Sequence, residues 1–268
     1  PREVLDEMER LMRAAREQLK KGSDVIKLMA SGGVATAGEL PTSYQLEEEE
    51  MRAAVREAHK RGKPATAHAH ATAGIKNALE AGVDCIEHGV YLDEEAVELM
   101  LKRDVALSPT LSVYKRILQG AEEGLVPAYR ADKAARLTKA QAESFRMALA
   151  AGVRITLGTD AVSVHHPLGD VAVELQLWVE NGMMPSAAIE AATRTASEVC
   201  QVNQEVGTLE PGKRADVLIV GGDALSDISA INDVRRVLRD GVTVYDALRE
   251  KSLTGFLADP VVRNPWNT

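Results

Sequence analysis

One arrangement of residues recurs along this chain: an amphipathic helix, a glycine or other small residue that ends it, and then a short apolar segment. Residues 4–21 place apolar side chains at helical spacing, Gly22 follows, and residues 24–30 form a short apolar run interrupted by one lysine. The same order predicts further helices over 46–61, 73–81, 93–103 and 138–151, followed by strands over 64–71, 83–88, 105–110 and 153–159. Buried strands separated by helices predict a parallel sheet in an α/β fold, either a barrel or a doubly wound sheet.

The pattern changes after residue 160. Helices are predicted over 170–181 and 185–199, and strands over 206–220 and 235–245, with turns at Pro211-Gly212 and Asp240-Gly241. We therefore expect an α/β domain over residues 1–204, a small β-domain over 205–247, and a C-terminal tail over 248–268 to which no structure is assigned.

The charge of the chain argues against two classes of partner. Lys plus Arg total 32 and Asp plus Glu total 40, so the formal net charge is −8. An acidic chain gains no general attraction to nucleic acid or to anionic membrane, and no apolar run is long enough to span a bilayer.

The two cysteines, Cys85 and Cys200, form no disulfide framework and are expected as buried thiols. With no secretory leader at the start of the given sequence, we expect a cytoplasmic protein.

Side chains that can bind a metal stand at the predicted strand ends. In parallel α/β folds, reactive residues gather at the carboxyl ends of the strands. These ends carry Lys27, the pair His68 and His70, then His88, and finally Asp160. His68 and His70 are two residues apart, so they face the same side of one strand. A single histidine is more often a core residue, but this pair with a third histidine on the next strand favours a metal site.

Lys27, Asp160 and the loop after Asp160 each admit two interpretations. A lysine in a buried strand either extends its amine to solvent or a carboxylate, or reacts with CO2 to form a carbamate, which is an anionic oxygen ligand. Asp160 serves as metal ligand, general base or both, and the alternative is a helix cap. In the loop, His165 or His166 contacts substrate or supports a metal ligand, and the alternative is simple exposure to solvent.

Several of these segments resemble the amidohydrolase superfamily, in particular its prolidase-like and imidazolonepropionase-related branch. The resemblance covers about residues 20–246 and so corresponds to the C-terminal two-thirds of the family's chain. The matching stretches are Ile26-Lys-Leu-Met-Ala-Ser-Gly-Gly-Val34, Ala67-His-Ala-His70, Ile86-Glu-His-Gly89, Ser108-Pro-Thr110, Leu157-Gly-Thr-Asp-Ala161 and Val206-Gly-Thr-Leu-Glu-Pro-Gly-Lys-Arg-Ala-Asp-Val-Leu-Ile-Val220. The last of these matches the family's C-terminal β-sandwich.

The resemblance implies a TIM barrel with one or two zinc ions at the carboxyl-end mouth. By position, the implied metal-site residues are Lys27 as the carboxylated lysine, His68, His88 and Asp160. His70 is implied as a variable neighbour that faces substrate, and Tyr114 as a residue that binds a substrate carboxylate.

The chain also departs from the family pattern. The family's first barrel strand ends in His-x-His, which supplies two further ligands, and no such motif precedes Lys27. The sequence predicts about five of the eight strand–helix units of a closed barrel and half of the β-sandwich. We therefore expect open sheet edges at 24–30 and 153–159, with Ile26, Leu28 and Ile155 less covered. Either an upstream segment or another chain, such as a second copy in a homo-oligomer, is expected to complete the barrel.

Two hypotheses of function follow. In the first, the chain belongs to a metal-dependent hydrolase, most similar to prolidase-like peptidases. A metal-activated hydroxide would cleave an amide-type bond in a dipeptide, N-acyl amino acid or cyclic amide, with Asp160 transferring the proton. In the second, the chain is a catalytically incomplete barrel that acts as a binding or interaction module. A structural zinc site is a third, weaker idea, because such sites are closed and rich in cysteine.

Overall fold

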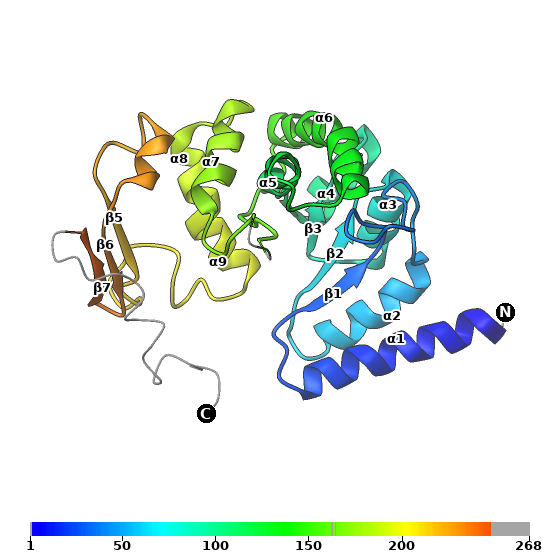
Figure 1. Ribbon diagram of the computed structural model, residues 1–268. Helices are drawn as coiled ribbons and strands as arrows, with labels where there is room; N and C mark the ends of the chain where they lie inside the picture. The colour runs from blue at the N-terminus through cyan, green and yellow to red at the C-terminus, as the bar shows by residue number, and fades with distance from the viewer. Residues whose placement is uncertain (1, 162, 164, 248–268) are drawn as a thin grey trace.

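The computed structural model describes residues 2–161, 163 and 165–247 (Figure 1). The expected tail over 248–268 lies outside the described residues. Within the described ranges, no helix combines the length and the apolar composition that a membrane crossing requires.

The first half of the described chain forms a parallel sheet with the strand order β1-β2-β3-β4. Its strands are β1 (Ile26–Met29), β2 (Ala65–Ala69), β3 (Cys85–His88) and β4 (Ala106–Ser108). The helices that precede and connect them are α1 (Arg2–Lys20), α2 (Glu48–His59), α3 (Thr72–Ala81) and α4 (Glu94–Arg103). Consecutive strands therefore lie side by side, and the predicted α/β fold with a parallel sheet is confirmed.

The helix boundaries follow the predicted capping signals. Gly82 ends α3 with a left-handed backbone at φ 91°, and Gly152 ends α6 in the same way at φ 82°. Both conformations are accessible to glycine without steric cost. Asp93 caps α4 by accepting a hydrogen bond of 2.9 Å from the backbone N–H of Ala96.

The second half of the described chain is largely helical and ends in a small antiparallel sheet of order β5-β6-β7. Its helices are α5 (Leu111–Glu122), α6 (Ala128–Ala151), α7 (Val171–Glu180), α8 (Pro185–Glu190), a π-helical turn (Ala191–Thr195) and α9 (Ala196–Val199). A 3₁₀ turn (Ile228–Asn232) lies within the second sheet's connections, and the strands are β5 (Val217–Val220), β6 (Val234–Arg239) and β7 (Val242–Asp246). The predicted turn at Asp240-Gly241 joins β6 to β7.

Three predicted elements were wrong in extent. Residues 153–159 form no regular strand; a single parallel bridge joins Ile155 to Leu107 of β4. This segment has only β4 beside it among the described residues, so few ladder bonds hold it. The strand predicted over 206–220 is confined to β5; the predicted turn at Pro211-Gly212 is present, and with a bend at Gly207 it leaves the earlier residues outside the strand. Helix α5 was not predicted at all, and α6 begins ten residues before its predicted start at 138.

Burial of the first sheet differs between its two faces. The outward face of β2 consists of Ala65, Ala67 and Ala69, which are fully buried because small side chains let the helices approach closely. Ile26, Leu28 and Ile155 are also buried, each 5% or 6% exposed, so the prediction that they are poorly covered was wrong. They belong to the core that packs against helices of the described chain.

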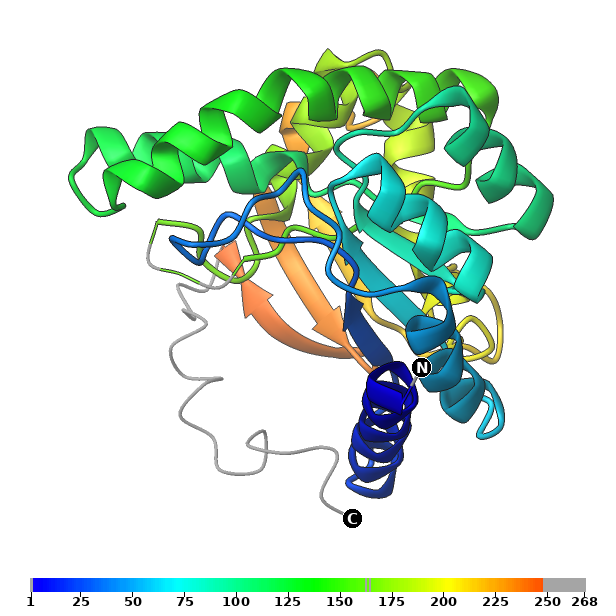
Figure 2. The ribbon, with the colours of Figure 1, turned by 90° about the vertical axis from the view of Figure 1, so that its right-hand side faces the viewer.

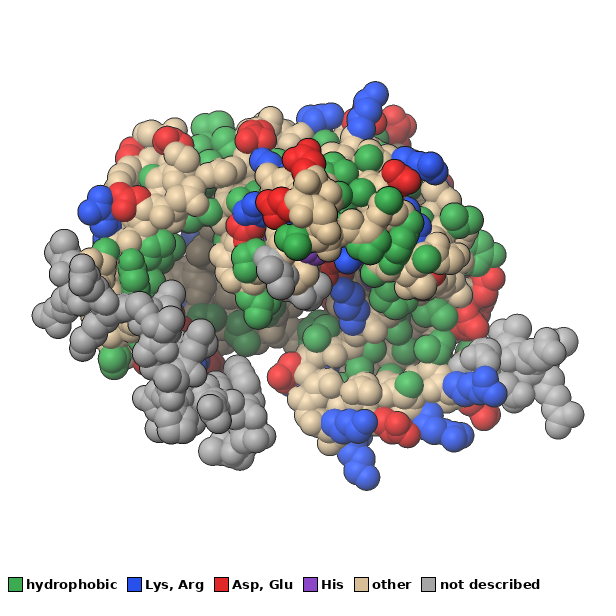
Figure 3. All heavy atoms as spheres, in the orientation of Figure 1, with side chains coloured by type: hydrophobic (Ala, Val, Ile, Leu, Met, Phe, Trp, Pro, Cys, Tyr) green, Lys and Arg blue, Asp and Glu red, His purple; other side chains and the backbone are tan. Residues whose placement is uncertain are grey.

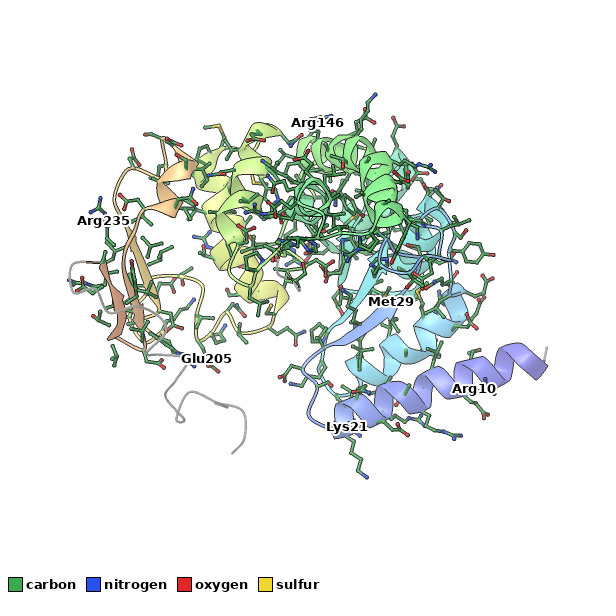
Figure 4. The ribbon with its side chains drawn as sticks, viewed as in Figure 1. Arg10, Lys21, Met29, Arg146, Glu205 and Arg235 are labelled. Atoms are coloured by element: carbon green, nitrogen blue, oxygen red, sulfur yellow. The ribbon has the colours of Figure 1, made fainter. Side chains whose placement is uncertain are left out.

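The opposite face of β1 is the open one. Lys27 is exposed, and Met29, labelled in Figure 4, is 43% exposed. The expectation that Lys27 sits in a buried strand was therefore wrong. β1 is an edge strand, paired only with β2 among the described residues, and the inward side chains beside that free edge lack a covering neighbour. Cys85 is buried as expected, whereas Cys200 at the end of α9 is exposed.

The two sheets lie at opposite ends of the molecule. Figures 1 and 2 place α7, α8 and α9 between the β5–β7 sheet and the parallel sheet, while α5 and α6 cross above β3 and β4. The space-filling view in Figure 3 is hollowed between the β5–β7 end and the end that carries β1 and α1. The free side of β1 therefore faces an open part of the surface.

Candidate metal centre

Two of the predicted site histidines come from β2. Alternation along this strand puts its alanines against the helices and sends His68, and then His70 just beyond the strand, to the opposite face. Their ring centroids are 4.4 Å apart. His68 is 8% exposed and His70 is 1% exposed, so both imidazoles are buried as the spacing predicted.

His88 joins this pair through an unusual backbone conformation. It is paired with Ala69, whose side chain points outward, so regular alternation would send His88 away from the other histidines. Its φ of 72° lies in the left-handed region, which re-aims the side chain. The His88 ring centroid consequently lies 4.6 Å from that of His68 and 4.8 Å from that of His70.

The three histidines form a donor set that fits a divalent cation. One ligand nitrogen from each of His68, His70 and His88 can be chosen so that all lie within 4.8 Å of one another. Burial holds the pKa of His68 down to about 4, helped by the positive charge of Lys27. Burial likewise places the pKa values of His70 and His88 well below the ordinary range. All three are therefore neutral at pH 7, which is the form of imidazole that binds zinc.

Lys27 and Asp160 lie near this cluster without belonging to it. The positive charge of Lys27 acts on the pKa values of His68, His88 and Asp160, which places Lys27 within electrostatic range of all three. Asp160 is exposed, yet the surrounding protein displaces enough water to raise its pKa, and the negative charge of Glu87 adds to this. The structure thus brings the predicted residues to one mouth, with His70 rather than Lys27 as the third clustered side chain.

Among the described residues, three of the six non-glycine residues with positive φ lie at this mouth. His88, Thr110 and Asp160 have φ values of 72°, 51° and 54°, in a region that non-glycine residues rarely adopt. His88 is the last residue of β3, Thr110 comes two residues after β4, and Asp160 directly follows the 153–159 segment; these three segments are neighbours. Such strain persists only where surrounding contacts enforce it, and it is typical of functional sites.

Side chains that the sequence did not single out support the cluster. The hydroxyl Oγ1 of Thr110 lies 2.6 Å from Nδ1 of His88, and Ser31 Oγ accepts a 2.7 Å hydrogen bond from the backbone N–H of His70. Thr110 belongs to the motif Ser108-Pro-Thr110, which the family resemblance includes without implying a role for Thr110. Glu174, fully buried on α7, is a further case; a carboxylate flanked by apolar residues in the middle of the predicted helix was the available signal.

The structure places the residues predicted to contact substrate in two different environments. The Tyr114 hydroxyl is buried and lies 3.3 Å from Nε2 of His70, so Tyr114 belongs to the centre. His165 instead bonds Ser163 at 3.1 Å and packs against Gly120 of α5. Within the described residues, no hydrogen bond or ring contact links His165 to the three histidines.

Comparisons with known proteins point to one family. The profile of the Amidohydrolase family matches residues 3–244. Ochratoxinase from Aspergillus niger is 38% identical over 236 residues, which are 87% of this chain and 48% of the relative. Imidazolonepropionase from Brevibacillus brevis is 30% identical over 180 residues, 62% of this chain and 42% of the relative.

A solved structure extends the likeness to the fold. The crystal structure of a Xaa-Pro dipeptidase with bound methionine in the active site has a TM-score of 0.83 and 34% sequence identity, covering 90% of this chain and 59% of that one. The chain thus spans about half the length of the curated relatives that it matches. Because the family profile extends over most of the sequence and the histidine cluster lies within the match, this chain belongs to the amidohydrolase family.

Proposed function

We propose that this chain carries most of the active site of a metal-dependent hydrolase that cleaves amide-type bonds. The single observation that carries the proposal is the convergence of three buried, neutral imidazoles at the strained carboxyl-end mouth of a parallel sheet. Membership of the amidohydrolase family and likeness to a Xaa-Pro dipeptidase and an ochratoxinase support the same reaction class.

The residues that would hold zinc are His68, His70 and His88, with Asp160 and a carbamate on Lys27 as oxygen donors. A bound zinc ion would lower the pKa of a water molecule and would polarise the carbonyl group that this water attacks. The chain's own part is to supply neutral nitrogen donors and a carboxylate. Asp160 accepts the proton of the attacking water and then donates it to the leaving nitrogen, and its raised pKa suits both halves of that task.

We place the substrate's carboxylate on the side of Tyr114. The buried Tyr114 hydroxyl lies 3.3 Å from Nε2 of His70, and a substrate carboxylate at the edge of the cluster would take the place of His70 as its hydrogen-bond partner. This position favours a dipeptide or N-acyl amino acid, in which a carboxylate follows the scissile amide closely. In this proposal His70 moves from a substrate contact to a candidate metal ligand, and His165 remains a candidate contact at the outer rim.

The open side of β1 is proposed to be covered in the working enzyme. Met29 and Lys27 lie on the same face as His68, on an edge strand whose second side has no partner among the described residues. Another segment or another copy that pairs with β1 would enclose Lys27 and complete a barrel. The boundary between an α/β domain over 1–204 and a β-domain over 205–247 is part of the same proposal.

Metal analysis combined with hydrolysis tests the function. The purified chain would be freed of metal with a chelator, dialysed against zinc, and analysed for zinc content and for cleavage of Xaa-Pro dipeptides and N-acyl amino acids. His88→Asn should lose zinc, while the matched control His59→Asn, on the exposed end of α2, should retain it. Wild-type protein that binds no zinc would overturn the proposal. Zinc retention without turnover of any amide would instead favour the binding-module hypothesis.

A further inference from the structure

A buried carboxylate lies behind the histidine cluster, on helix α7. Glu174 is 0% exposed and is surrounded by apolar residues of its own helix. Its Oε1 accepts hydrogen bonds from the backbone N–H of Leu111 at 2.7 Å and from the indole N–H of Trp178 at 2.8 Å. Its Oε2 accepts one from the backbone N–H of Ser112 at 2.6 Å. These three N–H groups, together with the Ser112 side chain, satisfy the carboxylate.

Two of these donors are the first backbone N–H groups of α5. The first four N–H groups of a helix have no partner within the helix, and a side chain at the N-cap position usually accepts from one of them. The N-cap residue of α5 is Thr110, a residue type suited to that task, but its side chain makes no capping hydrogen bond. Glu174 therefore does from α7 what Thr110 would ordinarily do locally.

The hydroxyl of Thr110 is thereby free for another partner. It lies 2.6 Å from Nδ1 of His88, and Thr110 itself has the left-handed φ of 51°. One turn further along α5, the hydroxyl of Tyr114 lies 3.3 Å from Nε2 and 3.4 Å from Nδ1 of His70. The first turn of α5 thus contacts two of the three histidines, and Glu174 fixes that turn.

We propose that Glu174 is a positioning residue for the metal centre: by capping α5 from α7, it releases Thr110 to orient His88 and holds Tyr114 against His70. When Nδ1 of His88 carries the proton and donates a hydrogen bond to the Thr110 hydroxyl, Nε2 carries the lone pair that can bind a cation. The proposal rests on the proposed function, because it assumes that His88 binds a metal. A purely structural cap would stabilise α5 without setting the tautomer of a histidine.

The test compares Glu174→Gln with Trp178→Phe in the full chain. Glutamine keeps an oxygen but presents an NH2 group to one of the backbone N–H groups of α5. Phenylalanine removes the indole donor to Glu174 and leaves both α5 bonds intact. The chain is labelled with ¹⁵N-histidine, and the imidazole shifts of His88 and His70 are recorded without metal. Zinc affinity is measured separately by competition with a chromophoric chelator.

Glu174→Gln should remove the fixed Nδ1–H tautomer of His88 and weaken zinc binding about 10–100-fold. Trp178→Phe should leave both readouts near the parent values, although it changes the same core. A Glu174→Gln variant that folds and keeps the parent's His88 and His70 shifts and zinc affinity would overturn the proposal. An equal loss in Trp178→Phe would also overturn it, because the effect would then belong to the core in general.

A second pair of variants keeps the question open to refutation if Glu174→Gln fails to fold. Thr110→Val removes the hydroxyl at nearly constant shape and should abolish the His88 tautomer signature, whereas Thr110→Ser should restore it. Identical His88 shifts in Thr110→Val and the parent would refute the positioning role. Because the tautomer is recorded in metal-free protein, it decides the inference even if the chain binds no zinc and the proposed function fails.

Discussion

Gly158 offers a sharp test of how the Asp160 loop is seated. It lies in the segment that pairs with β4 and precedes Asp160 by two residues. A Cβ added at Gly158 would lie 2.2 Å from Oγ of Ser108, but 3.6 Å from Cβ of Ser108 and Cγ2 of Thr110. The φ of Gly158 is not positive, so alanine can adopt its backbone conformation. The expected loss of stability in Gly158→Ala is therefore steric, and it comes from a clash with one atom, the hydroxyl oxygen of Ser108.

Overpacking of this kind typically costs about 1–3 kcal/mol. In a chain of this size, each kcal/mol corresponds to roughly 2–4 °C in Tm, so Gly158→Ala should melt several degrees lower. Ser108→Ala removes the clashing atom and leaves only contacts of ordinary length. The double variant should regain most of the loss, with a coupling energy of about 1–3 kcal/mol in a double-mutant cycle.

Urea denaturation of the four proteins in this cycle measures the coupling directly. Gly33→Ala is the matched control, because its added Cβ would meet the His68 ring at 3.5 Å, an ordinary contact. Turnover should follow the same order as stability, since the displaced segment carries Asp160. If Gly158→Ala is as stable as the parent, or if adding Ser108→Ala restores no stability, residue 158 does not pack against Ser108 of β4.

Three further predictions concern the centre itself. Lys27→Ala should lose most hydrolytic activity, and added short carboxylic acids should partly restore it by replacing the carbamate; undiminished turnover would exclude that role. Asp160→Asn should lower kcat about 10²–10⁴-fold while zinc content changes little, as metal analysis beside kinetics would reveal. In metal-free protein, His68 has a folded pKa of about 4 against 6.5 for the free side chain. Between these two pH values the unfolded chain binds more protons than the folded chain, so the folded state loses stability as the pH is lowered from 7. The loss by pH 5 should be about 2 kcal/mol from His68 alone, and His68→Asn should show a flatter urea-midpoint profile against pH.

The periodicity of the sequence was sufficient for the parts of the fold that depend on local pattern. Alternation predicted that His68 and His70 share one face of β2, and the structure confirms it because every outward neighbour on that strand is a small, buried alanine. The parallel sheet followed from short apolar strands separated by helices, but its strand order did not, because a barrel and a doubly wound sheet fit the same pattern. These features are local, so they needed no knowledge of distant residues.

The failures have a common cause in longer-range contacts. Alternation alone would have sent His88 outward, and only its left-handed backbone, held by a partner on the next strand's loop, turns it to the cluster. Lys27 was expected to be buried because its strand is apolar, but burial of that face depends on a neighbour that the described chain does not provide. The sequence did not predict a role for Glu174, because its partners Leu111 and Ser112 lie more than sixty residues away, at the start of an unpredicted helix.

The metal centre therefore has a supported side and an open side. His88 is held by Thr110, Thr110 is freed by Glu174, and Tyr114 closes on His70, so the imidazoles are ordered by contacts within the described chain. On the other side, Lys27 has no hydrogen bond or ion pair with any described residue, and its strand is an uncovered edge. Preorganised donors lose little entropy when they bind a cation, whereas an exposed lysine arm loses much. We therefore expect the three histidines to capture zinc in this chain alone, and the contribution of Lys27 to activity to increase when a second segment or copy covers β1.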